Sequence, residues 1–287
     1  MANEFNIISE YTDETIAYNH VKFLNPSDND FLLHLHTHDI CEFLFLKSGN
    51  ISGIINASAY KPTKNCLLIF RPRVPHRIQI EDATAYERYD ILFDENLLAN
   101  KVFYKLPKEV NLINLNGNNH VIDLFKKMDY YYKQFTGDDL KVIITNLVEE
   151  ILFNISIILP SDDFDKNLIT THPIISKAIN YINSHYTEDI KIEDISKHLG
   201  ITKSHLHHLF VENLQVSPKK FMNIKRLVKA QHLIRMGEAP SNIYLSCGFN
   251  EYTTFFRNYI SYFGHSPSEE NKLPIERKFE DISPDFV

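Results

Sequence analysis

The sequence predicts a multidomain protein, with an all-β barrel and a helical hairpin followed by an all-α domain. Between residues 31 and 93, short apolar runs alternate with Gly, Pro and Asn, which is typical of a β-sandwich or barrel. After about residue 95 the apolar residues recur every three or four positions, which indicates helices. The last third contains an internal repeat. At 287 residues the chain is long enough for two ordinary cores.

The composition indicates a folded protein that stays outside membranes. It is 44% hydrophobic and 23% charged, and the polar, acidic start MANEFNIISEYTDETIAY does not resemble a secretory signal. The most apolar long stretch, residues 142–159, contains Glu149 and Glu150. Adjacent carboxylates are costly in a membrane span, so this stretch is expected to be a buried helix. Three scattered cysteines without metal-site spacing fit a reducing cytoplasm.

Residues 1–95 are expected to form the barrel and residues 96–160 the helical hairpin. Apolar spacing predicts a first helix over 121–135, a break at Gly137, and a second helix from Asp138 to Leu159. Because the barrel has its own core, one side of the hairpin is expected to pack against a second subunit in a homodimer. The polar segment 161–173, which ends in a proline, is expected to be a linker.

Residues 174–270 contain the same pattern twice: a short helix, a glycine turn and a longer helix. Gly200 and Gly248 stand where the chain must leave a helix sharply, a place that favours glycine. Thr202 and Asn250 are expected N-caps of the helices that follow. The pattern indicates two helix-turn-helix units. The equivalent positions are Ile195 with Ile243, Gly200 with Gly248, Leu206 with Phe255, Phe210 with Tyr259, and Ser217-Pro218 with Ser266-Pro267.

The charge is unevenly distributed along the chain. The net charge is −7, with 30 Lys+Arg against 37 Asp+Glu. Residues 1–171 carry 16 basic and 24 acidic side chains, residues 172–270 carry 11 and 9, and the C-terminal tail 271–287 carries 3 and 4. The last third is therefore mildly basic beside an acidic partner. A balance of +2 agrees with DNA binding, although an ordinary solvated surface would look similar.

Residues 174–270 resemble the DNA-binding domain of the AraC/XylS family of bacterial transcription regulators. The resemblance is carried by AINYINSHYTEDIKIEDISKHLGITKSHLHHLF, by the CGF turn, by the arginine in the helix after it, and by the closing GHSP. It implies two helix-turn-helix units joined by a long helix, here about Pro218–Met236, with recognition helices in two successive major grooves of double-stranded DNA. It also implies promoter activation, with RNA polymerase as a further partner, although repression is an alternative.

Carrying the family pattern over selects two recognition helices, about Lys203–Asn213 and Glu251–Phe263. Arg257 is the best candidate for reading a base, because a guanidinium pairs bidentately with guanine; a surface salt bridge or phosphate contact is the alternative. His208 stands where the family usually has arginine. The outward positions are Ser204, His207 and His208 in the first helix and Thr253, Thr254 and Arg257 in the second. Candidate phosphate contacts are Lys203, Lys219, Lys220, Lys225 and Arg226.

The stretch HLHTHDICEFLFLKSG, with RPRVPH further on, matches the metal motif of the cupin barrel. His36, His38, Glu42 and His76 are expected to lie together, and three imidazoles with a carboxylate can hold Fe, Mn, Ni or Zn. Arg73 replaces the usual turn glycine. Many AraC-type regulators have this outline in an effector-binding barrel, where these side chains shape a polar pocket. We therefore expect no cofactor, with a divalent metal as the alternative.

Arginines near this motif provide a second feature of the expected pocket. Arg71, Arg73 and Arg88 could bind a carboxylate, a phosphate or sugar hydroxyls at a barrel mouth; ordinary edge-strand charge is the alternative. The whole chain is thus interpreted as a DNA-binding regulator, not an enzyme, that responds to a small-molecule effector. A sugar is suggested only by the family. The alternative is a metal-dependent cupin enzyme with a helical appendage.

Overall fold

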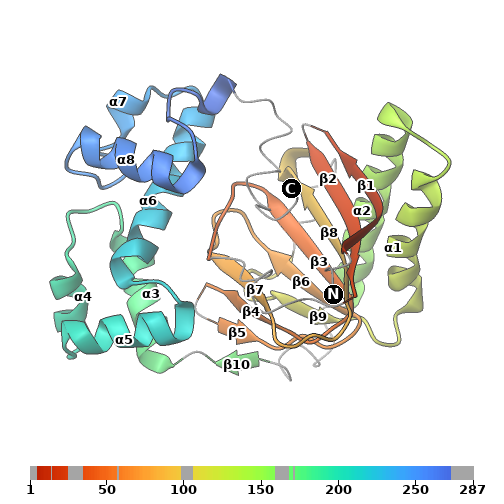
Figure 1. Ribbon diagram of the computed structural model, residues 1–287, viewed down its shortest axis with the longest axis horizontal. Coiled ribbons are helices and arrows are strands. Elements are labelled where there is room, and N and C mark those ends of the chain that lie inside the picture. The colour runs from red at the N-terminus through yellow and green to blue at the C-terminus, as the bar shows by residue number, and fades with distance from the viewer. Residues whose placement is uncertain are drawn as a thin grey trace.

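A computed structural model describes residues 5–13, 15–24, 35–56, 58–97, 106–158, 168–170 and 172–272. A two-sheet β domain forms the middle of the molecule, with two helices against one side and a separate group of helices on the opposite side (Figure 1). This is the expected fold class, an antiparallel β domain followed by a helical region. The start of the expected first strand, 31–34, and most of the tail, 273–287, lie outside the described residues.

The β domain consists of two antiparallel sheets. The larger has the strand order β1-β2-β8-β3-β6-β9, and the smaller has the order β10-β5-β4-β7. The short, closely spaced apolar runs of the sequence become these strands. Their bounds are β1 (Phe5–Thr12), β2 (Ile16–Phe23), β3 (Cys41–Ser48), β4 (Ile51–Ile55), β5 (Ser58–Tyr60), β6 (Cys66–Phe70), β7 (His76–Ile80), β8 (Tyr86–Phe93), β9 (Leu112–Asn114) and β10 (Leu168–Thr170).

Strand β3 lies at the centre of the fold and is buried on both faces. Successive side chains of a strand point to opposite faces. Phe43 and Phe45 pack in the core shared with the hairpin helices, whereas Leu44 and Leu46 pack in the core shared with the second sheet. This double burial explains why the strand is an almost continuous apolar run. It also places Glu42 on the inner face with Leu44, where a charged side chain needs partners.

The helical hairpin covers the outer face of the larger sheet. Helix α1 spans Asn119–Tyr132 and α2 spans Gly137–Ile158, close to the expected ranges. Their buried side chains join the core of the sheet. The outer side of α2 exposes Val142, Phe153 and Ile157, the last with 76% of its surface accessible. The segment 96–160 is not only a hairpin, however, because β9 within it pairs with β6.

Two further segments differ from the sequence expectations. The expected linker 161–173 contributes β10, which pairs with β5 through three residues. The expected strand over 31–37 is, in its described part, only a single bridge between His36 and His76. In that bridge each residue's backbone N–H donates to the other's carbonyl, at 3.0 and 2.9 Å. We call residues Leu35–Ile40, which lead directly into β3, the strap.

The C-terminal helices form two small cores on either side of the long helix α6. The first helix-turn-helix unit and the start of α6 share one core, and the second unit and the end of α6 share another. All paired apolar positions of the repeat are buried. Residues 240–243 form the short helix of the second unit. The bounds are α3 (Pro173–His185), α4 (Ile192–His198), α5 (Lys203–Leu214), α6 (Pro218–Arg235), α7 (Pro240–Ile243) and α8 (Tyr252–Phe263).

The turns of the two units are built as the glycines predict, but the caps differ. Gly200 and Gly248 have φ angles of +67° and +89°. The Thr202 side chain accepts a hydrogen bond from the third residue of α5, as expected of an N-cap. Asn250 was wrongly expected to cap α8: its amide donates to Asp189, and Glu251 holds the cap position. Within the described residues, no helix is long and apolar enough to cross a membrane.

Candidate DNA-reading surface and histidine cluster

Helix α5 presents the expected outward face in the first unit. Ser204, His207 and His208 are exposed, while the alternate positions of the helix, including Leu206 and Phe210, are fully buried. His208 lies 3.7 Å from the carboxylate of Glu212, one turn along the helix. Lys203, at the start of α5, forms an ion pair with Glu193. This face therefore offers imidazole and hydroxyl groups, with the lysine already paired within its unit.

Helix α8 presents the second face, and its charged member is Arg257. Thr253 and Arg257 are exposed and lie one turn apart, and Thr254 is half-buried beside them. The threonines do not cap the helix, because Glu251 occupies that position. Within the described part of the chain, no salt bridge to Arg257 is present, so the salt-bridge alternative finds no partner there. A guanidinium flanked by a hydroxyl on one helix face suits the edge of a base pair.

Arg226 is not a phosphate contact, and this corrects the sequence expectation. It is only 8% exposed, and its guanidinium donates from Nε to the Tyr186 carbonyl at 2.6 Å and from its terminal nitrogen to the Glu188 carbonyl at 2.9 Å. The arginine thus satisfies orphan carbonyls at the end of α3. Gly248 packs against it so closely that an added Cβ would lie 2.7 Å from Nε. Arg226 therefore joins the two helix-turn-helix units.

The other candidate phosphate contacts remain at or near the surface. Lys219 and Lys220 are exposed in the first turn of α6. Lys225 instead faces the β domain, where its ammonium donates to the Arg73 carbonyl at 3.1 Å. Burial and the neighbouring Arg73 lower the pKa of Lys225 to about 8. Lys219 and Lys220 are therefore the better candidates for phosphate contact.

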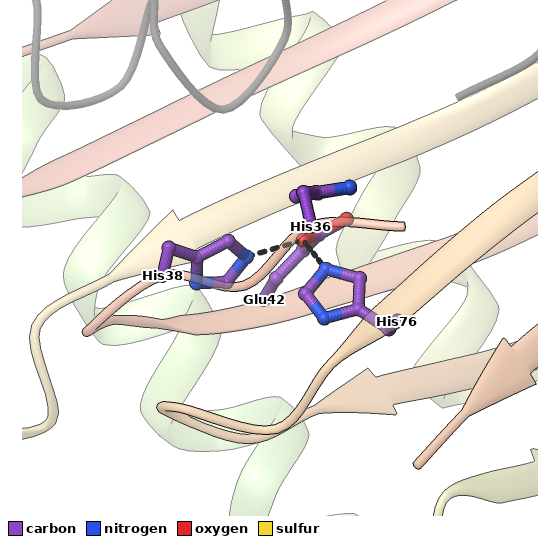
Figure 2. Close-up of side chains that lie close together, drawn as sticks. All are labelled: His36, His38, Glu42 and His76. Carbon is purple, nitrogen blue, oxygen red and sulfur yellow. Dashed lines mark hydrogen bonds and ion pairs between the residues drawn. The ribbon is translucent and has the colours of Figure 1, made fainter. Parts of the chain in front are cut away.

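The structure brings His36, His38, Glu42 and His76 together, as the spacing predicts. One ligand atom from each lies within 4.8 Å of the others. The strap supplies two imidazoles, β3 supplies the carboxylate, and the first residue of β7 supplies the third imidazole. Figure 2 shows His38 and His76 directed at the same oxygen, Oε2 of Glu42, from 2.9 and 3.2 Å. We call these four residues the histidine cluster.

Backbone carbonyls fix the orientation of two of these rings. Nδ1 of His38 lies 2.9 Å from the Ile40 carbonyl, and Nδ1 of His76 lies 2.8 Å from the Val74 carbonyl. Both rings therefore present Nε2 to the carboxylate. Burial lowers the pKa of His38.

The three candidate arginines do not form one pocket. Arg88 lies in the barrel interior, 3.4 Å from Asp90. Arg71 instead donates to the Pro107 carbonyl at 2.7 Å, in the loop before β9. Arg73 is exposed and has a φ of +63°, which explains why a glycine is usual there. Arg71 and Arg73 therefore contact different segments, the loop before β9 and the strap.

The space between the two sheets nevertheless contains buried polar atoms whose hydrogen bonds are not satisfied. Arg88 Nε, Asp90 Oδ1 and Asn19 Oδ1 are buried without a hydrogen-bond partner among the described residues. Asn19 and Asp90 face each other across β2 and β8. Burial and the nearby Glu42 raise the pKa of Asp90 well above its usual range. Buried unsatisfied groups of both donor and acceptor type suit a polar guest or trapped water.

A second polar site was missed by sequence reasoning. His20 contacts Asp129 through Nδ1 and Glu87 through Nε2, each at 3.0 Å, and Tyr89 donates to Asp129 at 2.6 Å. A cavity of about 370 Å³ lies next to Glu87 and Tyr89, between the larger sheet and α1. The carboxylate that joins this network comes from a helix 109 residues away from the histidine, so no local motif announces it.

Comparisons with known proteins bear on the helical region and on the whole chain. Residues 195–272 match the helix-turn-helix domain family. The lactose operon transcription activator of Staphylococcus xylosus is 36% identical over 96 residues, which is 33% of this chain and 34% of that protein. The transcriptional activator RhaS of Escherichia fergusonii is 24% identical over 257 residues, which is 82% of this chain and 86% of that protein. The chain is thus similar to transcription activators, over its last third to one and over most of its length to the other.

A solved structure can be compared with most of this chain. The apo form of a ToxT variant from Vibrio cholerae aligns over 90% of this chain and 97% of that one, with 13% identity and a TM-score of 0.40. Both relatives named above are transcription activators. The matched residues 195–272 include both candidate reading helices, with Arg257.

Proposed function

We propose that this protein is a sequence-specific DNA-binding transcription regulator of the AraC/XylS family that responds to a small molecule bound in its β domain. The observation that carries the proposal is the pair of helix-turn-helix units, each with a buried inner face and an exposed, hydrogen-bonding outer face. Arg226 fixes the spacing of the units by linking the end of α3 to the Gly248 turn. Two fixed reading helices are what two successive major grooves require.

The regulatory parts of the proposal follow from linkage. An effector can act only by binding differently to two arrangements of the β domain and the reading helices. The unsatisfied polar atoms of the barrel interior support a polar effector, and a sugar is the family's example. The exposed apolar side of α2 supports a homodimer. The proposal further holds that the protein acts in the cytoplasm, where it activates transcription through RNA polymerase. It also holds that the protein has no enzymatic activity.

The decisive test separates base reading from phosphate contact. Arg257→Ala should cost about 1–3 kcal/mol on the operator and should relax preference at one base pair. Lys219→Ala should weaken operator and scrambled duplexes about equally and lower the salt slope by about one unit at most. The measurement is duplex binding over a salt series, with the operator first selected from genomic fragments. Equal weakening of both duplexes by Arg257→Ala would reduce that residue to an electrostatic role.

The alternative of a metal-dependent enzyme is separated by a simpler experiment. Purified protein is assayed for mobility shifts on genomic fragments at low salt, in the presence of a chelator. A shift under these conditions supports a DNA reader that does not depend on a metal-centred reaction. Complete absence of binding by folded protein at low salt would overturn the proposed function.

A further inference from the structure

The histidine cluster has too many hydrogen-bond acceptors for the protein atoms alone. A neutral imidazole carries one N–H, and in His38 and His76 the Nδ1 atoms face carbonyl oxygens, which accept only. Each ring therefore presents the lone pair of Nε2 to the Glu42 carboxylate, which also only accepts. The lone pairs of the two Nε2 atoms and of the Glu42 carboxylate oxygen then converge on one buried point. A cation at that point would satisfy all three groups.

Protonating both His38 and His76 would be a less favourable source of positive charge than binding one metal ion. They would place two imidazolium rings, whose centroids are 4.8 Å apart, beside a single carboxylate in a buried site. A dication bound to both Nε2 atoms and to Glu42 needs no such pair of like charges. The carbonyls on Nδ1 then act as the outer-shell partners that orient metal-binding histidines. His36 completes a set of three nitrogens and one oxygen, which suits Zn²⁺ or a related transition metal.

The strap that carries two of these histidines also contacts the DNA-binding region. Asp39 forms an ion pair with His232 of α6 at 2.9 Å. Leu35 packs in the core of the first helix-turn-helix unit. The strap is tied in turn to the loop before β7, because the Arg73 N–H donates to the His38 carbonyl at 2.7 Å, and the Arg73 carbonyl accepts from Lys225 of α6. The groups that contact His232 and Lys225, the Asp39 carboxylate and the Arg73 carbonyl, therefore come from the strap and from the loop before β7.

We propose that the histidine cluster binds one divalent transition-metal ion, and that this ion holds the strap in the position that docks the β domain onto α6. Occupancy of the site then sets how firmly the reading helices are held against the barrel. The regulatory meaning of this docking rests on the proposed DNA-binding function, whereas metal binding and docking do not. Both are measurable without DNA.

The first experiment measures metal binding by the full chain. Protein stripped with a chelator is titrated calorimetrically with ZnCl₂, and separately with NiCl₂ and MnCl₂. One equivalent of at least one ion should bind, and His36→Ala and Glu42→Gln should each weaken it by at least about tenfold. His120→Ala, an exposed histidine in α1, is the matched control and should bind like the unaltered chain. Folded protein that binds none of the three ions, or binds them equally well in both cluster variants, overturns the proposal.

The second experiment measures docking by hydrogen–deuterium exchange, with and without the metal. In the unaltered chain and in His120→Ala, metal should slow exchange both in residues 35–40 and in the part of α6 around Lys225 and His232. In His232→Ala, metal should still bind and protect the strap, but protection of α6 should be lost. Metal protection confined to the barrel in the unaltered chain would overturn the docking. A failure of the operator assay with chelated protein would instead count only against the proposed function.

Discussion

Replacing Gly248 by alanine tests the link between the two helix-turn-helix units. The glycine has a φ of +89°, and a Cβ there would lie 2.6 Å from the Tyr186 carbonyl oxygen and 2.7 Å from Nε of Arg226. The left-handed conformation alone costs alanine about 1–2 kcal/mol. The clash also falls on the hydrogen bond between Arg226 and Tyr186, and a hydrogen bond to a charged group contributes about 1.5–3 kcal/mol. The free energy of unfolding should therefore fall by about 2.5–5 kcal/mol.

Gly200→Ala provides the matched control in the first unit. Gly200 has a φ of +67° but nothing within 4 Å of an added Cβ, so only the backbone strain of about 1–2 kcal/mol applies. Both variants and the unaltered chain are unfolded in urea, with the helical signal followed by far-ultraviolet circular dichroism. Equal losses of stability at the two positions would show that Arg226 and the Tyr186 carbonyl yield without cost, and would refute the view that this contact fixes the units.

Three further expectations concern the β domain and the hairpin. Asp129→Asn should lower stability by about 1–3 kcal/mol in urea unfolding, because the Asp129 carboxylate accepts a short hydrogen bond from Tyr89. The control Asp123→Asn, at an exposed position on the same helix, should change stability by less than about 0.5 kcal/mol. Equal effects of the two variants would contradict a stabilising hydrogen-bond network around Asp129. Burial alone would raise the pKa of Asp13, but hydrogen bonds, chiefly from backbone N–H groups, lower it to about 2. The contribution of this carboxylate to stability is therefore present above about pH 4 and is lost as the pH falls towards 2. Asp13→Asn should flatten this part of the dependence of stability on pH, and an unchanged dependence would contradict the lowered pKa of Asp13. Phe153→Asp should shift the proposed homodimer towards monomer in light scattering, because it places charge on the exposed apolar side of α2. An unchanged mass would exclude this face as the proposed interface.

The parts of the fold with a strong local pattern could be predicted from the sequence. The glycine turns and inward apolar positions of the helix-turn-helix units follow from spacing within about 25 residues, and the structure confirms them. The histidine cluster was also within reach, because three of its members lie within seven residues and only His76 is distant. Its members meet because His36 and His76 form a bridge.

Features that depend on distant backbone groups could not be predicted in this way. From the sequence, Arg226 would be placed on the surface of a helix, but the carbonyls it binds lie some 40 positions earlier. A sequence pattern does not reveal which backbone carbonyls lack a hydrogen-bond partner within their own helix. His20 and Asp129 are likewise joined only by the packing of α1 on the sheet. Arg71 and Arg73 are close in sequence but hold different loops.

The pairing of β10 with β5 restricts how the two halves of the molecule can move. Only two residues separate Thr170, the end of β10, from Pro173, where α3 begins. Fully extended chain spans roughly 3.5 Å per residue, so the near end of α3 stays within about 10 Å of the sheet edge while the strand is paired. Larger rearrangements must break the pairing of β10 with β5. The backbone N–H and C=O groups of β5 would then be exposed and could pair with a strand of another chain. The connector therefore acts as a short tether and also shields a sheet edge from intermolecular pairing.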